Sequence, residues 1–141
     1  MTATTAATNP PAHDTQTTRV RTLATRVRDH ARSTPSRVAM RQKELGIWRE
    51  ITWASYWDTV QTVGHALLAL GIEPGDRVAI HAENVREWLF TDVATVAVRG
   101  ASVGIYPTNP SAEVQYVLNH SGAKILVAED QEQLDLSLIH I

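Results

Sequence analysis

The segment that most constrains the fold of this chain runs from Trp88 to Pro110 and reads WLFTDVATVAVRGASVGIYPTNP. Its first part predicts a helix that is apolar almost all round, and such a helix must be covered on several sides. Gly100 then closes the helix, and the apolar run 101–105 predicts a strand buried on both faces. The Pro-Thr-Asn-Pro sequence that follows predicts a rigid loop. These features together predict a large α/β layered structure.

Hydrophobic periodicity extends this pattern in both directions. Short apolar strands alternate with helices from Arg77 onward, which predicts a mainly parallel sheet. Before that point, Leu45-Gly46 forms the turn of an expected hairpin. We expect helices at 20–31, 52–70, 86–98 and 112–120, strands at 38–40, 47–51, 78–80, 101–105 and 125–128, and a further helix that starts at Glu129-Asp130.

Capping and turn residues place several of these boundaries. Thr52 and Ser111 are expected N-caps, because a hydroxyl accepts a hydrogen bond from an orphan backbone N–H. Gly71 is the expected C′ residue of the helix at 52–70. Glu73-Pro74-Gly75-Asp76 has the signature of a type II turn. The apolar stripe of the helix at 52–70 is expected to comprise Tyr56, Val60, Val63, Leu67 and Leu70.

Composition excludes several classes of function. The chain has 141 residues, 43% of them hydrophobic, with a formal net charge of −2 and no cysteine. The low charge disfavours nucleic acid as the main partner. Without cysteine there is no disulfide, thiolate zinc site or thiol nucleophile. No uncharged apolar run is long enough for a transmembrane helix, and Asp92 interrupts the nearest candidate.

The two ends of the chain differ from its middle. Residues 1–18 are rich in Thr, Ala and Pro, and we expect a disordered tail there rather than an organelle-targeting peptide. Residues 136–141 read Leu-Ser-Leu-Ile-His-Ile, which resembles the translation of a transposon adapter used in sequencing libraries. We therefore expect a non-native tail at 136–141, the alternative being a natural apolar helix end. The expected domain is 19–135.

A few polar residues are candidates for a site, and each has a structural alternative. His81 follows a strand, where ligands collect in α/β sheets, but we favour a polar loop residue. His120 is expected to complement the dipole at a helix end. Glu129 and Asp130 could form a carboxylate pair, although a helix start is the commoner role. Asp92 is expected to be a structural carboxylate bonded to neighbouring backbone.

For two further groups of residues, a structural role is favoured over a binding role. Aromatic side chains could form a ligand surface, but packing in a core or interface is the commoner role of tryptophan; these are Trp48, Trp53, Trp57 and Trp88. The arginines within 19–37 could bind anionic lipid, but we favour the interpretation that they form a solvent-exposed helix face.

The order of short motifs resembles the adenylate-forming enzymes, which include the AMP-binding acyl-CoA synthetases. Ile51-Thr52-Trp53, Pro74-Gly75-Asp76-Arg77-Val78 and Glu87-Trp88 are similar to successive family signatures. Gly104-Ile105-Tyr106-Pro107-Thr108 resembles a loop of the long-chain fatty-acyl branch, and Tyr116–Ser121 and Glu129–Leu134 fit that branch as well. The resemblance covers about 20–135. Arg99 departs from it, because the family usually carries a small residue there.

The resemblance implies an N-terminal portion of a large AMP-binding domain in an acid–thiol ligase. Such an enzyme uses ATP, Mg²⁺ and coenzyme A to convert a fatty acid to its acyl adenylate and then to a thioester. Its phosphate-binding loop needs Gly, Ser and Thr in series, and no such run and no GxxxxGK[ST] motif occurs in this sequence. The resemblance places the catalytic residues beyond the end of the chain, so no catalytic, cofactor-binding or metal-binding residue is assigned.

The expected partners are therefore small molecules of the full-length parent, namely fatty acid, ATP and coenzyme A, with none bound to this fragment. We expect a cytoplasmic location, with peripheral association at the inner face of the membrane as an open option. Two other hypotheses stay open: an adenylate-forming enzyme for an aryl or amino acid, and a non-catalytic α/β binding module.

Overall fold

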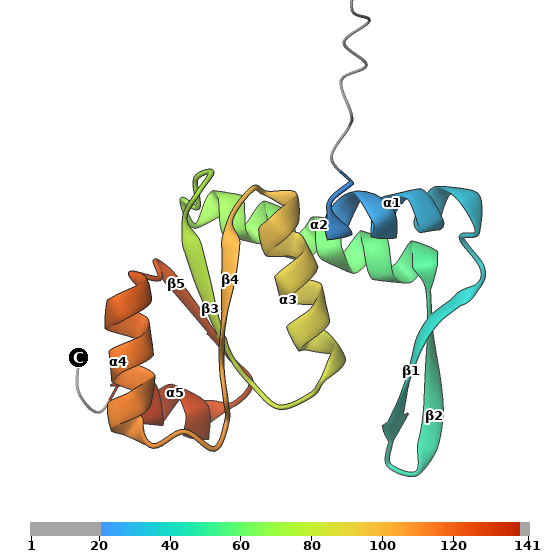
Figure 1. Ribbon diagram of the computed structural model, residues 1–141. Coiled ribbons are helices and arrows are strands. Elements are labelled where there is room, and N and C mark those ends of the chain that lie inside the picture. The colour runs from blue at the N-terminus through green and yellow to red at the C-terminus, as the bar shows by residue number, and fades with distance from the viewer. Residues whose placement is uncertain (1–20, 139–141) are drawn as a thin grey trace, which may run out of the picture.

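The computed structural model describes residues 21–138, with side chains to Asp135. Two layers of helices enclose a small parallel sheet, and a hairpin projects from this body (Figure 1). The elements in chain order are α1 (Leu23–Ser33), β1 (Val38–Glu44), β2 (Ile47–Thr52), α2 (Trp53–Ala69), β3 (Arg77–His81), α3 (Arg86–Ala97), β4 (Ala101–Ile105), α4 (Ser111–Ser121), β5 (Ile125–Ala128) and α5 (Gln131–Leu138). The expected tail at 1–18 and the end of the chain at 139–141 lie outside the described residues.

Side-chain caps begin the first two helices. The Thr22 hydroxyl accepts from the Thr25 N–H at 3.2 Å, and the Thr52 hydroxyl accepts from the Ser55 N–H at 3.2 Å. Each bond satisfies an N–H that has no partner inside its helix. The predicted cap at Thr52 is thus confirmed, and it joins the hairpin directly to α2.

The hairpin pairs β1 and β2 in antiparallel register. Its turn residues Leu45 and Gly46 both have positive φ, +48° and +82°, which is the type I′ geometry that matches the twist of two antiparallel strands. Arg41 pairs with Glu50 across the strands at 2.8 Å. The predicted hairpin is confirmed, although β1 extends four residues beyond the expected strand at 38–40.

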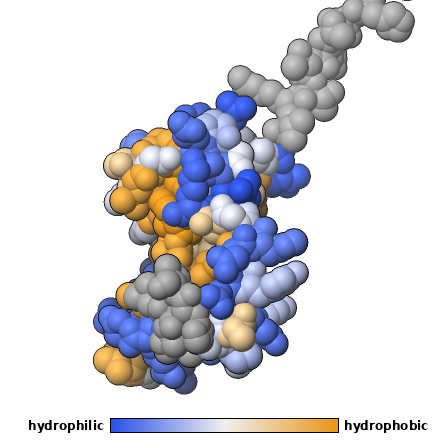
Figure 2. Space-filling model, turned by 90° about the vertical axis from the view of Figure 1, so that its left-hand side faces the viewer, coloured by the Kyte–Doolittle hydropathy of each residue, from blue (hydrophilic) through white to orange (hydrophobic). Residues whose placement is uncertain are grey.

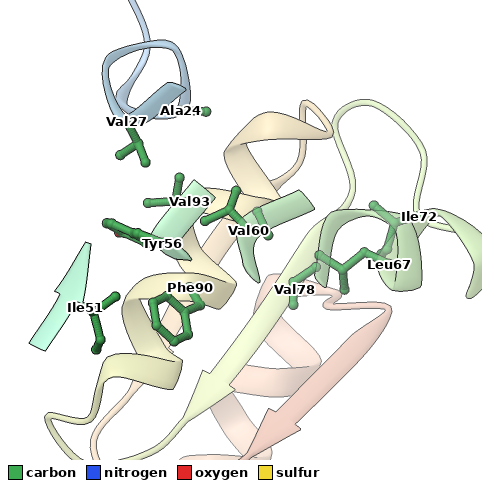
Figure 3. Close-up of a cluster of buried hydrophobic side chains, with 11 residues drawn as sticks. Ala24, Val27, Ile51, Tyr56, Val60, Leu67, Ile72, Val78, Phe90 and Val93 are labelled. Carbon is green, nitrogen blue, oxygen red and sulfur yellow. The ribbon is translucent and has the colours of Figure 1, made fainter. Parts of the chain in front are cut away.

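The central sheet is parallel, in the order β4-β3-β5. Alternation along β3 sends Val78 to one face and Ala79 to the other. Val78 joins the larger core, which α1, α2 and α3 supply with Val27, Tyr56, Val60, Leu67, Phe90 and Val93 (Figure 3). Ala79 joins a smaller core with Ile105 of β4 and Val114 of α4. The predicted parallel α/β architecture is therefore confirmed.

The junction between α3 and β4 is the tightest point of the backbone. Gly100 has no room for a side chain, because a Cβ there would lie 3.0 Å from Thr95 Cγ2 and 3.2 Å from the Asp76 carbonyl oxygen. The residue that turns left-handed after α3 is Arg99, at φ +67°. Gly100 was expected to close the helix, but it is needed instead because the backbone there packs against Thr95 and the Asp76 carbonyl group. The predicted type II turn is present, with Gly75 at φ +93° and Asp76 N–H bonded to the Glu73 carbonyl.

Three further expectations are wrong. β4 is not buried on both faces, because it is an edge strand with β3 as its neighbour, and Ala101 and Gly104 are exposed. Leu70 is 69% exposed, because it lies past the last turn of α2 and outside the apolar stripe. Ser111 is the first residue of α4 rather than its cap; Pro110 holds the cap position, with no side-chain hydrogen bond.

Some apolar surface remains open to solvent. Figure 2 shows hydrophobic side chains gathered at the upper left of the face that it presents. Leu68 and Leu70 at the end of α2 are large apolar residues with at least half of their surface exposed. Among the helices of residues 21–138, none combines the length and apolarity needed to cross a bilayer.

Candidate functional site

The carboxyl ends of β3 and β4 form a topological switch point. The loop after β3 leads to α3, which packs on the face of the sheet that holds Val78. The loop after β4 leads to α4, which packs on the opposite face. Because these neighbouring strands send their loops in opposite directions, a crevice opens between them, and ligands of open α/β sheets bind at such places.

A cavity of about 430 Å³ occupies this crevice. The loop after β3 contributes Ala82, Glu83 and Asn84, while β4 and the loop after it contribute 104–108. The Trp88 indole forms a further wall and packs on Gly104, where a Cβ would lie 3.4 Å from Trp88 Cζ2. The cavity therefore combines aromatic walls with one carboxylate and one amide.

The loop after β3 is held by two hydrogen bonds to Glu129, the residue that follows β5. The Glu129 carboxylate accepts from the Glu83 N–H at 2.7 Å, and the Glu129 N–H donates to the His81 carbonyl oxygen at 3.1 Å. Asp130 caps α5, because its carboxylate accepts from the Gln133 N–H at 3.0 Å. The expectation that Glu129 and Asp130 begin a helix is confirmed, and both carboxylates have structural roles.

A second cavity of about 430 Å³ adjoins the first and shares Asn84 and Trp88 with it. Its other wall is β1 of the hairpin. The Gln42 side-chain oxygen accepts from the Arg86 N–H at 3.3 Å, and Arg86 pairs with Glu44 at 2.6 Å. Hydrogen bonding to Glu87, together with the charge of Glu44, raises the pKa of Arg86, so this cation anchors the hairpin to α3 at any physiological pH.

His81 is not the polar loop residue that the sequence predicts. It is the last residue of β3, its side chain is completely buried, and neither ring nitrogen has a hydrogen-bond partner among the described residues. Strand alternation puts it on the face that holds Ala79. The imidazole therefore lies beneath the crevice, in the layer covered by α4, rather than lining the cavity.

The remaining predicted polar residues are structural. Asp92 accepts a hydrogen bond from the Ser102 hydroxyl of β4, so it is a satisfied carboxylate as expected, but its partner is a side chain rather than backbone. His120 lies in the last turn of α4 and stacks on Tyr116 with ring centroids 5.4 Å apart. Burial, with a smaller contribution from the Asp92 charge, raises the pKa of Tyr56 to about 12, so this phenol stays protonated.

The tryptophans do not form one surface. Trp53 stacks between His30, at 4.5 Å, and Tyr56, at 6.2 Å. Trp57 packs on the larger core, and Trp88 lines the crevice. Trp48 is exposed on the hairpin, contrary to the expected packing. The arginines of α1 face solvent; Arg28 pairs with Asp29 at 3.0 Å.

The crevice does not fit the triphosphate of ATP. Glu83 is the one ionisable side chain apart from Tyr106 among the described residues that line the first cavity, and its negative charge repels phosphate. The first N–H of α3 is already bonded to Gln42. Residues 21–135 contain no group of three or more metal-ligating side chains that could hold Mg²⁺. No step of adenylation is therefore assigned to these residues.

The architecture and its switch point define an open α/β domain of the kind that binds small molecules at strand ends. The family model described as "AMP-binding enzyme" matches residues 27–140. The chain therefore belongs to the AMP-binding enzyme family.

Individual relatives agree with this assignment. The chain is 34% identical over 107 residues to the long-chain-fatty-acid–CoA ligase FadD15 of Mycobacterium bovis, which covers 76% of this chain and 18% of the relative. It is 35% identical to the long-chain-fatty-acid–CoA ligase ACSBG1 of Bos taurus, over 69% of this chain and 13% of that protein. The chain thus spans less than a fifth of the length of these relatives.

Solved structures show the same fold. The N-terminal domain of FACL13 from Mycobacterium tuberculosis superposes with a TM-score of 0.73 at 24% identity, covering 79% of this chain and 29% of that one. The putative long-chain-fatty-acid CoA ligase from Rhodopseudomonas palustris gives a TM-score of 0.72 at 25% identity, over 82% and 28% of the two chains. The predicted fold class is confirmed.

Sequence reasoning missed the residues that line the crevice. The rule that ligands bind at the carboxyl ends of parallel strands pointed to His81, the last residue of β3. The lining residues of this loop follow it, at 82–84. The same rule applied to both loops would have found Glu83, Asn84 and Tyr106. Trp88 is seven residues beyond β3, and its approach to Gly104 depends on how α3 packs against β4.

Proposed function

We propose that this chain is the N-terminal part of an ATP-dependent long-chain fatty-acid–CoA ligase. The observation that carries the proposal is the 34% identity to a long-chain ligase across 76% of the chain. The Tyr106-Pro107-Thr108 loop, which resembles the fatty-acyl branch, supports the same substrate. The full-length enzyme would convert a fatty acid to its acyl adenylate and then transfer the acyl group to the thiol of coenzyme A.

The proposal assigns ATP, Mg²⁺ and coenzyme A to the full-length parent and none of them to this fragment. It assigns the portion 19–135 to the ligase domain, 1–18 to a tail and 136–141 to non-native sequence. It places the enzyme in the cytoplasm. We assign no catalytic residue here, because a phosphate loop is missing from the sequence and the crevice repels phosphate.

The reading frame beyond codon 135 provides the test. We expect it to continue into a loop rich in Gly, Ser and Thr, and we expect the resulting protein to catalyse ATP–pyrophosphate exchange with palmitate. Benzoate and a panel of amino acids serve as competing substrates. A natural stop codon at that point, or exchange with an aryl or amino acid in place of palmitate, would contradict the proposal.

The 141-residue chain itself should give no exchange above background. Its control is the longer protein assayed at the same concentration. Turnover by the short chain would show that a phosphate site exists within it.

A further inference from the structure

The tip of the hairpin carries Leu45, the most exposed of the large apolar side chains in the described part of the chain. Leu45, Ile47 and Trp48 are 103%, 59% and 62% exposed. The hairpin projects from the body (Figure 1), and Glu44, the residue before the turn, ties it to α3 through the ion pair with Arg86. Three large apolar side chains within four residues are thus open to solvent at the tip.

Leu45 is also a poor residue for its backbone conformation. It sits at φ +48°, in a type I′ turn position where Asn, Asp or Gly is favoured. A leucine there bears the strain of a left-handed backbone and gains no burial in return. Within the described residues Leu45 therefore adds no burial that would offset this strain.

The hairpin carries a small excess of positive charge. The ten residues 41–50 hold three cations and two carboxylates, for a net charge of +1, whereas the whole chain carries −2, which leaves −3 on the remainder. Lys43 lies directly opposite Trp48 in the hairpin and belongs to no ion pair among the described residues. Arg41 and Arg49 pair with Glu50 and Glu44 on an exposed surface, where such pairs exchange partners at little cost.

We propose that the hairpin tip, residues 45–48, is a membrane anchor that inserts into an anionic phospholipid surface. Leucine and isoleucine side chains enter the acyl region, tryptophan sits at the level of the headgroups, and the long stem of lysine lets its ammonium reach phosphate. The choice of a lipid surface over another partner rests partly on the proposed function, because a long-chain fatty acid partitions into membranes.

Cosedimentation with vesicles tests the anchor without ATP or fatty acid. We expect the chain to bind vesicles of phosphatidylcholine with phosphatidylglycerol, and to bind pure phosphatidylcholine more weakly. Leu45→Asn should lower the partition coefficient by about tenfold or more, because a fully exposed leucine loses its burial in lipid. This variant should fold at least as well as the natural chain, because asparagine tolerates positive φ.

Leu70→Asn is the matched control, since Leu70 is an exposed leucine at the opposite end of α2 from the hairpin. It should bind vesicles as the natural chain does. Quenching of tryptophan fluorescence by brominated lipid should occur and should largely disappear in Trp48→Phe. Absence of vesicle binding, or equal losses in Leu45→Asn and Leu70→Asn, would overturn the anchor.

A second copy of the chain as the occupant of the tip would give a distinct result. A contact between copies of the chain would appear in analytical ultracentrifugation as a dimer that Leu45→Asn dissociates, with no vesicle binding, and would overturn the proposal. If the parent enzyme catalyses palmitate-dependent ATP–pyrophosphate exchange but the chain does not bind vesicles, only the anchor is overturned. If the chain binds vesicles but the parent shows no palmitate-dependent exchange, the proposed substrate is contradicted and the anchor stands.

Discussion

At the scale of single residues, His81 is the least expected feature of the chain. Its side chain is completely buried at the end of the central strand, and both ring nitrogens lack hydrogen-bond partners among the described residues. A buried polar group without a partner costs roughly 1–3 kcal/mol. The layer on this face includes the apolar residues Ala79, Ile105 and Val114.

Replacing His81 by leucine should therefore stabilise the fold. The side chains are of similar size, so we expect the free energy of unfolding to rise by about 1–2 kcal/mol in urea denaturation. His81→Asn, which keeps a buried polar group, should show no gain. A less stable His81→Leu variant would indicate that the imidazole has a partner, such as an ordered water molecule.

The ion pair between Asp76 and Lys124 makes stability depend on pH. Lys124 Nζ lies 2.8 Å from Asp76 Oδ2, which also accepts from the Glu73 N–H at 2.7 Å. Hydrogen bonding to Lys124, followed by that to the Glu73 backbone, lowers the pKa of Asp76 in the folded state. The pair joins the turn before β3 to the start of β5.

A carboxyl whose pKa is lower when folded stabilises the protein fully above its unfolded pKa, which is about 3.9 for aspartate. That contribution disappears as the pH falls through the folded pKa. We expect the melting temperature to decline below about pH 4, and the decline to be shallower in Asp76→Asn. Lys124→Met, which leaves the Glu73 hydrogen bond, should have an intermediate effect. Identical pH profiles for all three proteins would contradict this assignment.

At the scale of elements, helix ends connect the layers. Gln42 from the hairpin receives the first N–H of α3, and Thr52 at the end of β2 caps α2. At its other end, α3 finishes with Arg99 in the left-handed region at φ +67°, and the Arg99 carbonyl oxygen accepts from the Gly75 N–H at 2.9 Å. The resemblance to adenylate-forming enzymes predicted a small residue at this position.

Arg99→Gly should stabilise the chain, because glycine adopts positive φ without steric cost. A non-glycine residue in the left-handed region costs roughly 1–2 kcal/mol, and the extra freedom of glycine in the unfolded state offsets part of that. We expect a net gain of about 0.5–1 kcal/mol in denaturant titrations. Arg99→Ala is the control, and it should give no gain, since alanine keeps the Cβ. Equal stabilities of Arg99→Gly and Arg99→Ala would show that the backbone at this position is unstrained.

At the scale of the whole molecule, the sheet is open at both edges. β4 and β5 each pair with β3 alone among the described strands, and Leu68 and Leu70 at the end of α2 are at least half exposed. Exposed strand edges and apolar patches favour association.

We therefore expect the isolated chain to self-associate as its concentration rises and to bind a hydrophobic dye in its folded state. Light scattering and dye fluorescence across a concentration series are the measurements, with the longer parent protein as the control. A monomeric preparation with a sharp cooperative thermal transition and no dye binding would argue against this expectation.

The amino-acid sequence alone determined the order of elements, the parallel sheet, the Thr52 cap, the Leu45-Gly46 turn and the turn at Glu73–Asp76. These depend on the spacing of apolar residues and on interactions within a few residues of the chain, so they can be inferred locally. Only the tertiary structure decided the burial of His81, the Ser102 partner of Asp92, the edge position of β4 and the crevice beside Trp88. Each of these depends on which distant segment packs alongside, and hydrophobic periodicity carries no information about that choice.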